Sequence, residues 1–333
     1  MGDVWLLGIE IGGTKLQLGL GRADGSLRAI ERLRVDAARG APAILDQVRT
    51  AFQALLERSS LTPDAIHGVG VGFGGPVDVA GGRVQTSYQV PGWTNFPLVA
   101  WLREHLGIAA AAVQNDADTA GLAEARFGAG VGCSPLLYLT IGSGIGGALI
   151  IDGQIYRGAG LGAAEIGHME IPDLSRPDAA FLELEQIASG WGIARQAREQ
   201  AKQILEEAGG HWVVLERAGG EPQAITAEIV AQAVREGDER AERVLDRSRQ
   251  ALAFALRQAI VLLAPRRIIL GGGVSLIGAT HWFEPVRRLV DASVFAPFRG
   301  SYDIVPAALG EEVVVHGALA LAQAAATEKR LTG

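Results

Sequence analysis

Glycine-rich turns are the first features of this sequence whose residue types and spacing could bind a ligand. In the stretch LTIGSGIGGALIIDG (residues 139–153), Gly142, Gly144 and Gly147 match the G-x-G-x-x-G spacing of a dinucleotide-binding turn. Such a turn must open a helix, because the pyrophosphate lies at the helix N-terminus. Here an apolar run is followed by Asp152-Gly153, which is typical of a strand entering a tight hairpin. The stretch therefore predicts strand, glycine turn and strand, and disfavours an NAD site.

A second copy of this pattern lies near the N-terminus. In LGIEIGGTKLQLGL (residues 7–20), apolar residues alternate through a turn at Gly12 and Gly13, and ADG at residues 23–25 marks another hairpin. Each turn carries a hydroxyl residue, Thr14 or Ser143. Backbone N–H groups at glycine turns bind anions, since glycine permits positive φ and a close backbone approach. The pair predicts a duplication whose turns hold nucleotide phosphates from both sides, with two ligand-free structural hairpins as the alternative.

The elements that must position these turns alternate between strands and helices. Apolar residues at helical spacing predict an amphipathic helix over residues 41–58, and short apolar runs predict buried strands. We therefore expect α/β architecture in each half of the chain. The first half has expected helices at 41–58, 97–106 and 119–127 and strands at 68–73 and 109–113; the second has helices at 181–208, 225–236, 240–263 and 317–326 and strands at 267–270 and 304–305.

Composition excludes several classes of function. The 333 residues carry a formal net charge of -7, so no basic surface for nucleic acid is indicated. The single cysteine, Cys133, excludes an internal disulfide and a multi-cysteine zinc site. No apolar run approaches the ~20 residues of a membrane span, and the N-terminus does not read as a signal peptide. We expect a soluble cytoplasmic protein without nucleic-acid or membrane partners.

Several short motifs occur in an order that resembles one family. EIGGTK (residues 10–15), GGPVD (74–78), ND (115–116), GSGIGG (142–147) and EIGH (165–168) are followed by ASG (188–190), GGG (271–273) and HGA (316–318). This ordered set resembles the ROK family of sugar kinases and repressors, within the actin- and hexokinase-like ATPases. The resemblance implies an α/β, two-domain actin-like ATPase (ribonuclease H-like) fold with an interdomain active-site cleft. Its small N-terminal domain would span residues 1–117, completed by a C-terminal helix at about 317–330, and its large domain residues 118–316.

The resemblance also implies an activity, that of an ATP-dependent hexose kinase, most often a glucokinase acting on the 6-hydroxyl of glucose. Asp116 would be the general base, and a carboxylate in that role contributes about 10²–10⁴-fold to the rate. Mg²⁺ and the glycine turns would supply the alignment and charge neutralisation that phosphoryl transfer needs. Asp116 follows the expected strand at 109–113, so it should project from a strand end, where α/β proteins bind ligands.

The implied site residues fall into three sets. The implied hexose contacts are Gly75, Asn115, Asp116, Glu165, His168 and Glu185. The implied ATP contacts are Gly12, Gly13, Thr14, Lys15, Gly142, Ser143, Gly144, Gly271, Gly272 and Gly273, and Mg²⁺ would bind with ATP near Glu10. Two structural alternatives stand beside these roles: Asp118 is expected to cap a helix that begins near Thr119, and Glu183 is as available as Glu185. The family also suggests a homodimer or a homotetramer.

The sequence departs from the family pattern at several points. Many members carry a cysteine-rich zinc loop after the EIGH motif, whereas residues 169–181 here contain no cysteine, so we expect no structural zinc and a His168 held by packing or hydrogen bonds. Glu10 stands where aspartate is usual, Ala164 replaces a glycine, and Gln89 lies where an asparagine is frequent. These departures leave other acceptors open, namely N-acetylmannosamine, fructose, allose or a cyclitol, as well as polyphosphate as donor. A DNA-binding repressor is disfavoured, because no helix-turn-helix precedes Leu6 and the chain is acidic.

Overall fold

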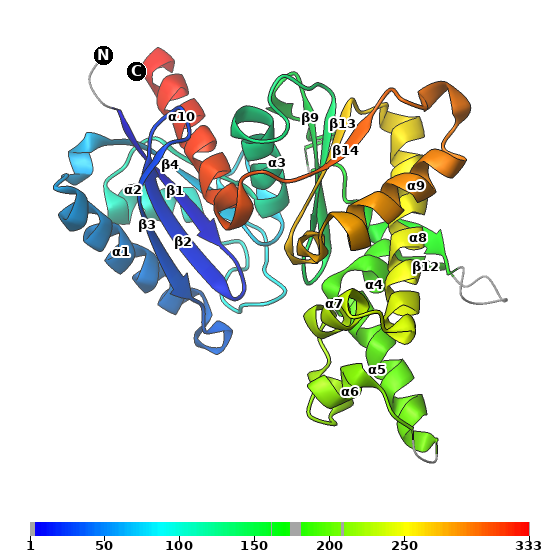
Figure 1. Ribbon diagram of the computed structural model, residues 1–333. Coiled ribbons are helices and arrows are strands. Elements are labelled where there is room, and N and C mark those ends of the chain that lie inside the picture. The colour runs from blue at the N-terminus through cyan, green and yellow to red at the C-terminus, as the bar shows by residue number, and fades with distance from the viewer. Residues whose placement is uncertain (1–3, 161, 174–180, 208–209, 333) are drawn as a thin grey trace. The chain divides into compact units, whose positions relative to one another are not determined.

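The chain forms two compact units, seen in a computed structural model that describes residues 4–160, 162–173, 181–207 and 210–332 (Figure 1). The first unit comprises Met1–Gly132, Ala148–Ala163 and Ala307–Gly333, and the second Cys133–Gly147 and Ala164–Pro306. The sequence predicts a domain boundary after residue 117. That boundary would cut helix α3 (Asp116–Phe127), whereas the observed division keeps the helix whole within the first unit. That helix packs tightly on α10 (Val313–Thr332), where a Cβ on Gly317 would lie 1.9 Å from the Thr119 carbonyl oxygen. Both helices therefore belong to the first unit.

The first unit is built on a five-stranded sheet in the order β3-β2-β1-β4-β7 (Figure 1). The N-terminal strands β1 to β3 are antiparallel, while β1, β4 and β7 are parallel. The predicted glycine turn joins β1 to β2, and Gly12 N–H donates to the Lys15 carbonyl at 2.9 Å. The carboxyl ends of β1, β4 and β7 thus meet at one edge. The strands are β1 (Trp5–Ile11), β2 (Lys15–Gly21), β3 (Leu27–Arg34), β4 (Ile66–Phe73) and β7 (Ala111–Asn115).

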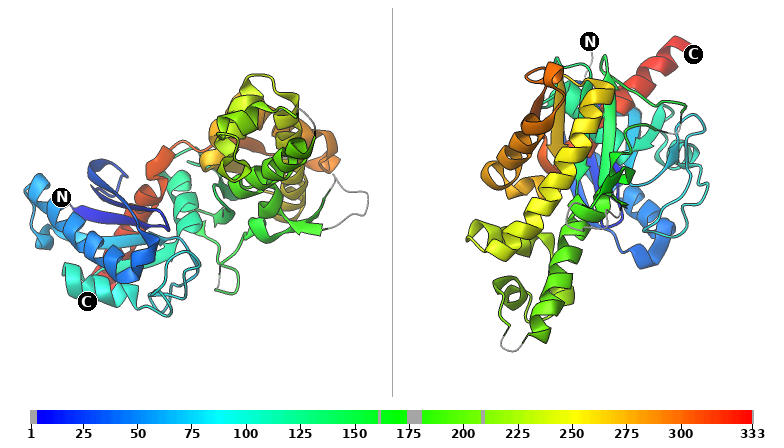
Figure 2. Two further views of the ribbon diagram at one scale, coloured as in Figure 1. Left: turned by 90° about the horizontal axis from the view of Figure 1, so that it is seen from below. Right: turned by 90° about the vertical axis from the view of Figure 1, so that its right-hand side faces the viewer.

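Helices cover both faces of this sheet (Figures 1 and 2). On one face, alternate apolar residues of the strands pack against α1 (Gly40–Ser59) and α2 (Leu98–Leu106). On the other face the alternate strand positions are glycines, and a Cβ on Gly70 would lie 2.0 Å from the Ala318 carbonyl oxygen of α10. Glycine is required there because the helix backbone lies directly on the sheet. The short strands β5 (Val77–Asp78) and β6 (Arg83–Val84) form a separate hairpin.

The second sheet has the order β10-β9-β8-β13-β14, with β8, β13 and β14 parallel. The predicted hairpin after the glycine-rich stretch is confirmed, because Asp152 and Gly153 have φ of 51° and 74° between the antiparallel strands β9 and β10. Positive φ at both central residues is the requirement of a type I′ turn. The strands are β8 (Leu136–Ile141), β9 (Ile145–Ile151), β10 (Gln154–Ile155), β13 (Arg267–Gly271) and β14 (Asp303–Pro306).

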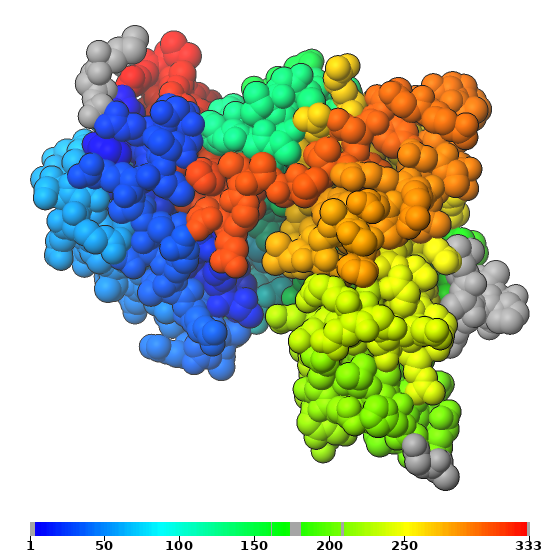
Figure 3. Space-filling view, viewed as in Figure 1, coloured from blue at the N-terminus to red at the C-terminus, as the bar shows by residue number. Residues whose placement is uncertain are grey.

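The helices of the second unit surround a core that includes Ile193, Leu256 and Trp282. One prediction here was wrong: residues 181–207 do not form one helix, and residue 208 lies outside the described residues. Phe181–Glu183 instead forms β12, paired with β11 (Glu170–Pro172), and Ser189 is extended between α4 and α5. In the space-filling view, residues of η5 (Gly273–Ile277) and α9 lie above those of α7 on the surface of this unit (Figure 3). The helices are α4 (Leu184–Ala188), α5 (Gly190–Glu206), α6 (Val213–Arg217), α7 (Ala227–Arg235), α8 (Glu239–Leu263) and α9 (Glu284–Ser293).

Within the described part of the chain, no helix combines the length and the apolar character needed to cross a bilayer.

Candidate active site

The first unit gathers acidic side chains at the carboxyl ends of its parallel strands. Glu10 lies near the end of β1, and Asp116 directly follows β7. The Oδ2 atom of Asp116 lies 3.6 Å from where a Cβ of Gly74 would stand, just after β4. Lys15 Nζ contacts Glu10 Oε1 at 3.0 Å and donates to the Glu311 carbonyl at 3.2 Å. The predicted base and the β1–β2 turn are therefore neighbours within this unit.

The start of helix α3 differs from the prediction. The helix begins at Asp116 rather than near Thr119, and its N-cap is Asn115 rather than Asp118. Asn115 Oδ1 accepts hydrogen bonds from the N–H groups of Ala117 and Asp118 at 2.8 and 3.3 Å. Its Nδ2 donates to the Gly75 carbonyl at 3.2 Å, which joins two predicted sugar contacts. Asp116 thus occupies the first helical position, where the helix dipole stabilises a negative charge.

Burial dominates the electrostatics of Glu10. Its side chain is 11% exposed, and its Oε2 has no hydrogen-bond partner among the described residues. Burial raises the pKa of Glu10 from 4.5 to about 7; Lys15 opposes this rise, while Asp116 and Glu311 add to it. A buried, unpartnered carboxylate oxygen beside another acid fits a hard divalent cation such as Mg²⁺. The prediction that Mg²⁺ binds near Glu10 remains open, and the residues present suit it.

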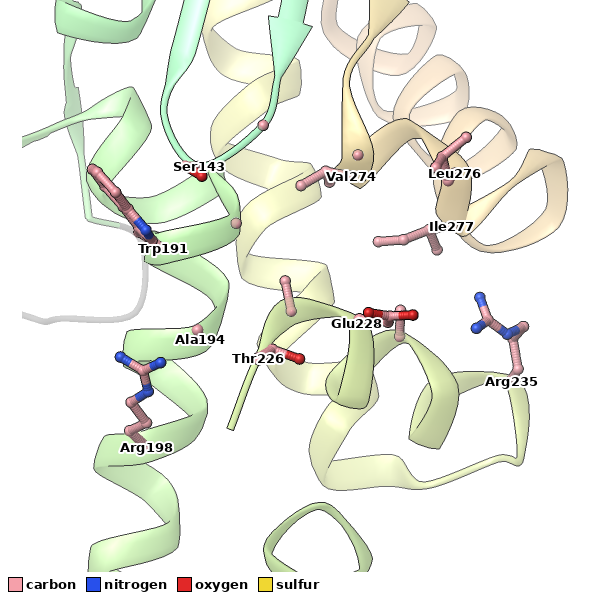
Figure 4. A pocket seen from close by; sticks show the side chains of 15 residues that line it. Ser143, Trp191, Ala194, Arg198, Thr226, Glu228, Arg235, Val274, Leu276 and Ile277 are labelled. Carbon is pink, nitrogen blue, oxygen red and sulfur yellow. The ribbon is translucent and has the colours of Figure 1, made fainter. Parts of the chain in front are cut away.

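The second unit contains a cavity of about 760 Å³ at the end of the β8–β9 turn (Figure 4). Gly142, Ser143 and Gly273 line it, so predicted nucleotide contacts from two distant motifs come together. Figure 4 shows Trp191 and Arg198 on α5 along one side, and Thr226 and Glu228 opposite the apolar residues of η5. The full lining is Gly142, Ser143, Gly190, Trp191, Ala194, Arg198, Thr226, Ala227, Glu228, Ala231, Arg235, Gly273, Val274, Leu276 and Ile277.

Three glycine segments pack backbone to backbone at one end of this cavity. Gly190 N–H donates to the Gly142 carbonyl at 2.8 Å, and a Cβ on Gly190 would lie 2.9 Å from that oxygen. Gly272 has a φ of 82°, and its Cβ would lie 2.5 Å from the Ile141 carbonyl oxygen. Both positions therefore require glycine. The same contacts place the N-terminus of α5, a 17-residue helix, beside the β8–β9 turn, which favours anions there.

Several side chains that the sequence analysis did not identify determine which chemical groups the cavity can bind. Trp191 and Leu276 are 63% and 80% exposed, an unusual state for large apolar residues that line one cavity. Arg198 donates to the Ile225 carbonyl through Nε and Nη2 at 3.1 and 2.8 Å and so fixes the chain before α7. Glu228 lies in the first turn of α7, which Thr226 caps by accepting from Ile229 N–H at 3.3 Å. The motif ASG at 188–190 marked this region, but nothing in the sequence marked Glu228.

A second cluster of polar side chains also contacts the β8–β9 turn. Among the described residues, the group of side chains whose spacing could hold a metal ion comprises His168, Glu183 and Glu185, with ligand atoms within 4.8 Å of one another. His168 Nδ1 lies 3.5 Å from Glu183 Oε1. Glu165 is exposed and occupies the N-cap position of η3 (Ile166–His168), without a capping hydrogen bond from its side chain. Residues 174–180, part of the segment expected to lack zinc, lie outside the described residues.

The β8–β9 turn contacts both the cavity and this cluster, through different residues. Gly142 and Ser143 line the cavity, whereas Ile145 N–H donates to Glu185 Oε2 at 3.3 Å. The same Oε2 would lie 2.8 Å from a Cβ on Gly144, so the carboxylate is packed onto the turn. A ligand group bound at this turn would therefore be close to both the cavity and the Glu185 carboxylate.

Comparison with known proteins gives this geometry a family. The family model described as ROK family matches residues 6–325. The chain belongs to the ROK family. It is similar to a glucokinase of Thermotoga maritima, at 30% identity over 322 residues, covering 95% of this chain and 96% of the relative. A kanosamine kinase of Amycolatopsis mediterranei is 33% identical over 328 residues, covering 97% of each chain.

A solved relative supports the same assignment. A ROK family glucokinase from Streptomyces griseus, determined in complex with glucose and AMPPNP, matches with a TM-score of 0.78 and 28% identity, covering 96% of this chain and 99% of that one. The fold is therefore the predicted α/β actin-like ATPase fold, and the protein is a sugar phosphotransferase.

Proposed function

We propose that this ROK protein is an ATP-dependent hexose kinase that phosphorylates the 6-hydroxyl of glucose. The observation that carries the proposal is that one turn, β8–β9, borders the cavity through Gly142 and Ser143 and contacts Glu185, a member of the cluster of His168, Glu183 and Glu185, through Ile145. Phosphoryl transfer needs the leaving oxygen of the donor, the phosphorus and the attacking oxygen of the acceptor roughly in line. A phosphate held at Gly142–Gly144 would have the nucleoside on one side and the hexose on the other.

The cavity supports ATP rather than polyphosphate as the donor. Its apolar residues Trp191, Val274, Leu276 and Ile277 suit the faces of a purine, and Glu228 can accept hydrogen bonds from ribose hydroxyls or an exocyclic amine. Polyphosphate has neither a base nor a ribose, so it would leave this surface unused.

In the proposed mechanism, Asp116 accepts the proton of the 6-hydroxyl as the hydroxyl oxygen attacks the γ-phosphorus. A new P–O bond forms, the bond to the β-phosphate bridging oxygen breaks, and ADP leaves with the electron pair. Asp116 supplies general-base catalysis, while Lys15, the turn at Gly12 and Gly13 and the turn at Gly142–Gly144 stabilise phosphate charge. Mg²⁺ bound with ATP would supply further charge neutralisation, with Glu10 near it.

The acceptor assignment rests on the His168–Glu185 cluster and on the relatives named as glucokinases. A carboxylate and an imidazole within 4.8 Å of one another can hydrogen-bond adjacent hydroxyls of a pyranose. Sites built to bind hydroxyl groups reject sugars that leave those groups unpaired. We therefore expect glucose to be preferred over sugars that differ at one hydroxyl.

A coupled assay of ADP release tests the proposal, with glucose, N-acetylmannosamine, fructose, allose and a cyclitol as acceptors. Glucose is expected to give the highest kcat/KM, and mass spectrometry of the product should show phosphate on the 6-oxygen. A parallel assay with polyphosphate should give at most a few per cent of the ATP rate. Turnover of another acceptor in place of glucose would refute the acceptor assignment, and faster turnover with polyphosphate would refute the donor assignment.

A further inference from the structure

Glu183 has no part in the proposed mechanism, yet it is the carboxylate that faces His168. The Nδ1 of His168 lies 3.5 Å from Glu183 Oε1, and both side chains are accessible to solvent. Glu185, the predicted sugar contact, instead directs Oε2 to Ile145 N–H on the glycine turn. The two glutamates therefore contact different partners.

The backbone fixes this pair of side chains. His168 ends η3, and the chain then enters β11, which pairs with β12 so that Glu170 lies opposite Glu183. Leu184 N–H donates to the Met169 carbonyl at 2.9 Å, which ties the residue after Glu183 to the residue after His168. The distance between the imidazole and the carboxylate thus follows from strand register.

We propose that Glu183 is a positioning residue, which holds the Nδ1–H tautomer of His168 so that Nε2 accepts a hydrogen bond from a hydroxyl of the hexose. A neutral imidazole has one donor nitrogen and one acceptor nitrogen, and the partner of one nitrogen decides the role of the other. A carboxylate can only accept hydrogen bonds, so a carboxylate beside Nδ1 favours the tautomer that carries the proton on Nδ1. A contact of 3.5 Å shortens to a hydrogen bond with a small side-chain rotation, as such contacts tighten in the substrate complex. The role as stated rests on the proposed function.

The same cluster gives a competing explanation that the experiment must separate. His168, Glu183 and Glu185 could together bind a divalent cation. A cation on Nδ1 would displace the proton, so the tautomer with Nδ1–H would be absent. The two explanations therefore differ in a measurable property of the sugar-free protein.

The variants Glu183→Ala and Glu183→Gln test the inference, with Glu170→Gln as the matched control. Glu170 is an exposed glutamate directly opposite Glu183 on β11. Because Glu183 is itself partly exposed, we expect all three variants to fold, and thermal unfolding checks this. In ¹⁵N-histidine NMR of the sugar-free protein, His168 should carry its proton on Nδ1 in wild type and in Glu170→Gln, but not predominantly in Glu183→Ala.

Kinetics supply the functional result. Glu183→Ala should raise KM for glucose about tenfold, the equivalent of one hydrogen bond, and change kcat less than about threefold. Glu183→Gln should recover part of the loss, because its amide oxygen still accepts. An unchanged tautomer and KM in Glu183→Ala would overturn the inference, as would a stoichiometric metal in wild type whose chelation reproduces the variant. If wild type phosphorylated no hexose, the proposed function would fail, while the NMR result would still decide the contact between Glu183 and His168.

Discussion

Replacing Glu10 by glutamine should make the protein more stable at alkaline pH and leave its stability nearly unchanged in acid. The side chain of Glu10 is 11% exposed, and its Oε2 has no hydrogen-bond partner among the described residues. Burial raises the pKa of Glu10 from 4.5 to about 7, despite the ion pair with Lys15. Folding therefore carries a cost whenever this group is ionised, and glutamine removes the charge while keeping the shape.

The size and pH window of the effect follow from the two pKa values. Because the pKa is raised in the folded state, the protonated carboxyl contributes stability that is fully present below pH 4.5 and lost as the pH rises through about 7. At ~1.4 kcal/mol per pKa unit, the loss approaches about 3 kcal/mol by pH 8. Glu10→Gln should thus match wild type at pH 4 and exceed its free energy of unfolding by up to about 3 kcal/mol at pH 8.

Urea unfolding of wild type and Glu10→Gln at several pH values between 4 and 8 measures this difference. Glu57→Gln serves as the control, since Glu57 is exposed on α1. Hydrogen exchange of the β1 and β4 amides assigns the effect to the first unit, because two units need not unfold together. A difference that changes by less than ~0.5 kcal/mol across this range would refute the burial argument. Added MgATP should shrink the difference if a cation binds beside the ionised carboxylate.

Three further predictions test the site and its supporting loop. Asp116→Asn should lower kcat by about 10²–10⁴-fold and keep KM for glucose within about tenfold, and retention of more than a tenth of kcat would remove Asp116 as the base. Trp191→Ala should raise KM for ATP about tenfold and leave KM for glucose unchanged, measured by varying each substrate in turn; an equal rise in both would contradict a nucleoside-specific role. Ala164→Gly should raise the free energy of unfolding by about 0.5–1 kcal/mol, because Ala164 has a φ of 62°, whereas the same change at Ala163, which lacks a positive φ, should lower it.

The hairpins and most helices could be predicted because their signals are local. The apolar run at residues 148–151 and the Asp152-Gly153 pair define the hairpin after the glycine turn, and φ is positive at both residues of the pair. The strand motif GVGVGF at 68–73 predicted a buried strand correctly, but not why its alternate residues are glycines. That reason is α10, which comes about 250 residues later and lies on Gly70. A contact of such sequence separation leaves no local signal.

Two errors in the sequence interpretation share a physical cause. Residues 115–118 include several residues that could cap a helix. Asn115 becomes the N-cap because β7 ends there and helix α3 begins at the next residue. The helical pattern after Phe181 continues through Ser189, but Gly190 must lie against the Gly142 carbonyl, so the chain becomes extended there. In both places a tertiary contact overrides local propensity.

On the proposed function, the packing of the β8–β9 turn implies that different residues determine the rate of phosphoryl transfer and the choice of substrate. The turn meets its neighbours through the backbone, because a Cβ on Gly190 or Gly272 would lie 2.9 or 2.5 Å from a carbonyl oxygen of residues 141–142. On the proposed function, the backbone N–H groups of the turn hold a phosphate, which every donor and every phosphorylated acceptor has in common. Selectivity must come from side chains beyond its two ends, Trp191 towards the nucleoside and Glu185 towards the sugar. Substitutions in the turn should thus lower turnover for every acceptor alike, whereas substitutions at either end should change the preferred substrate.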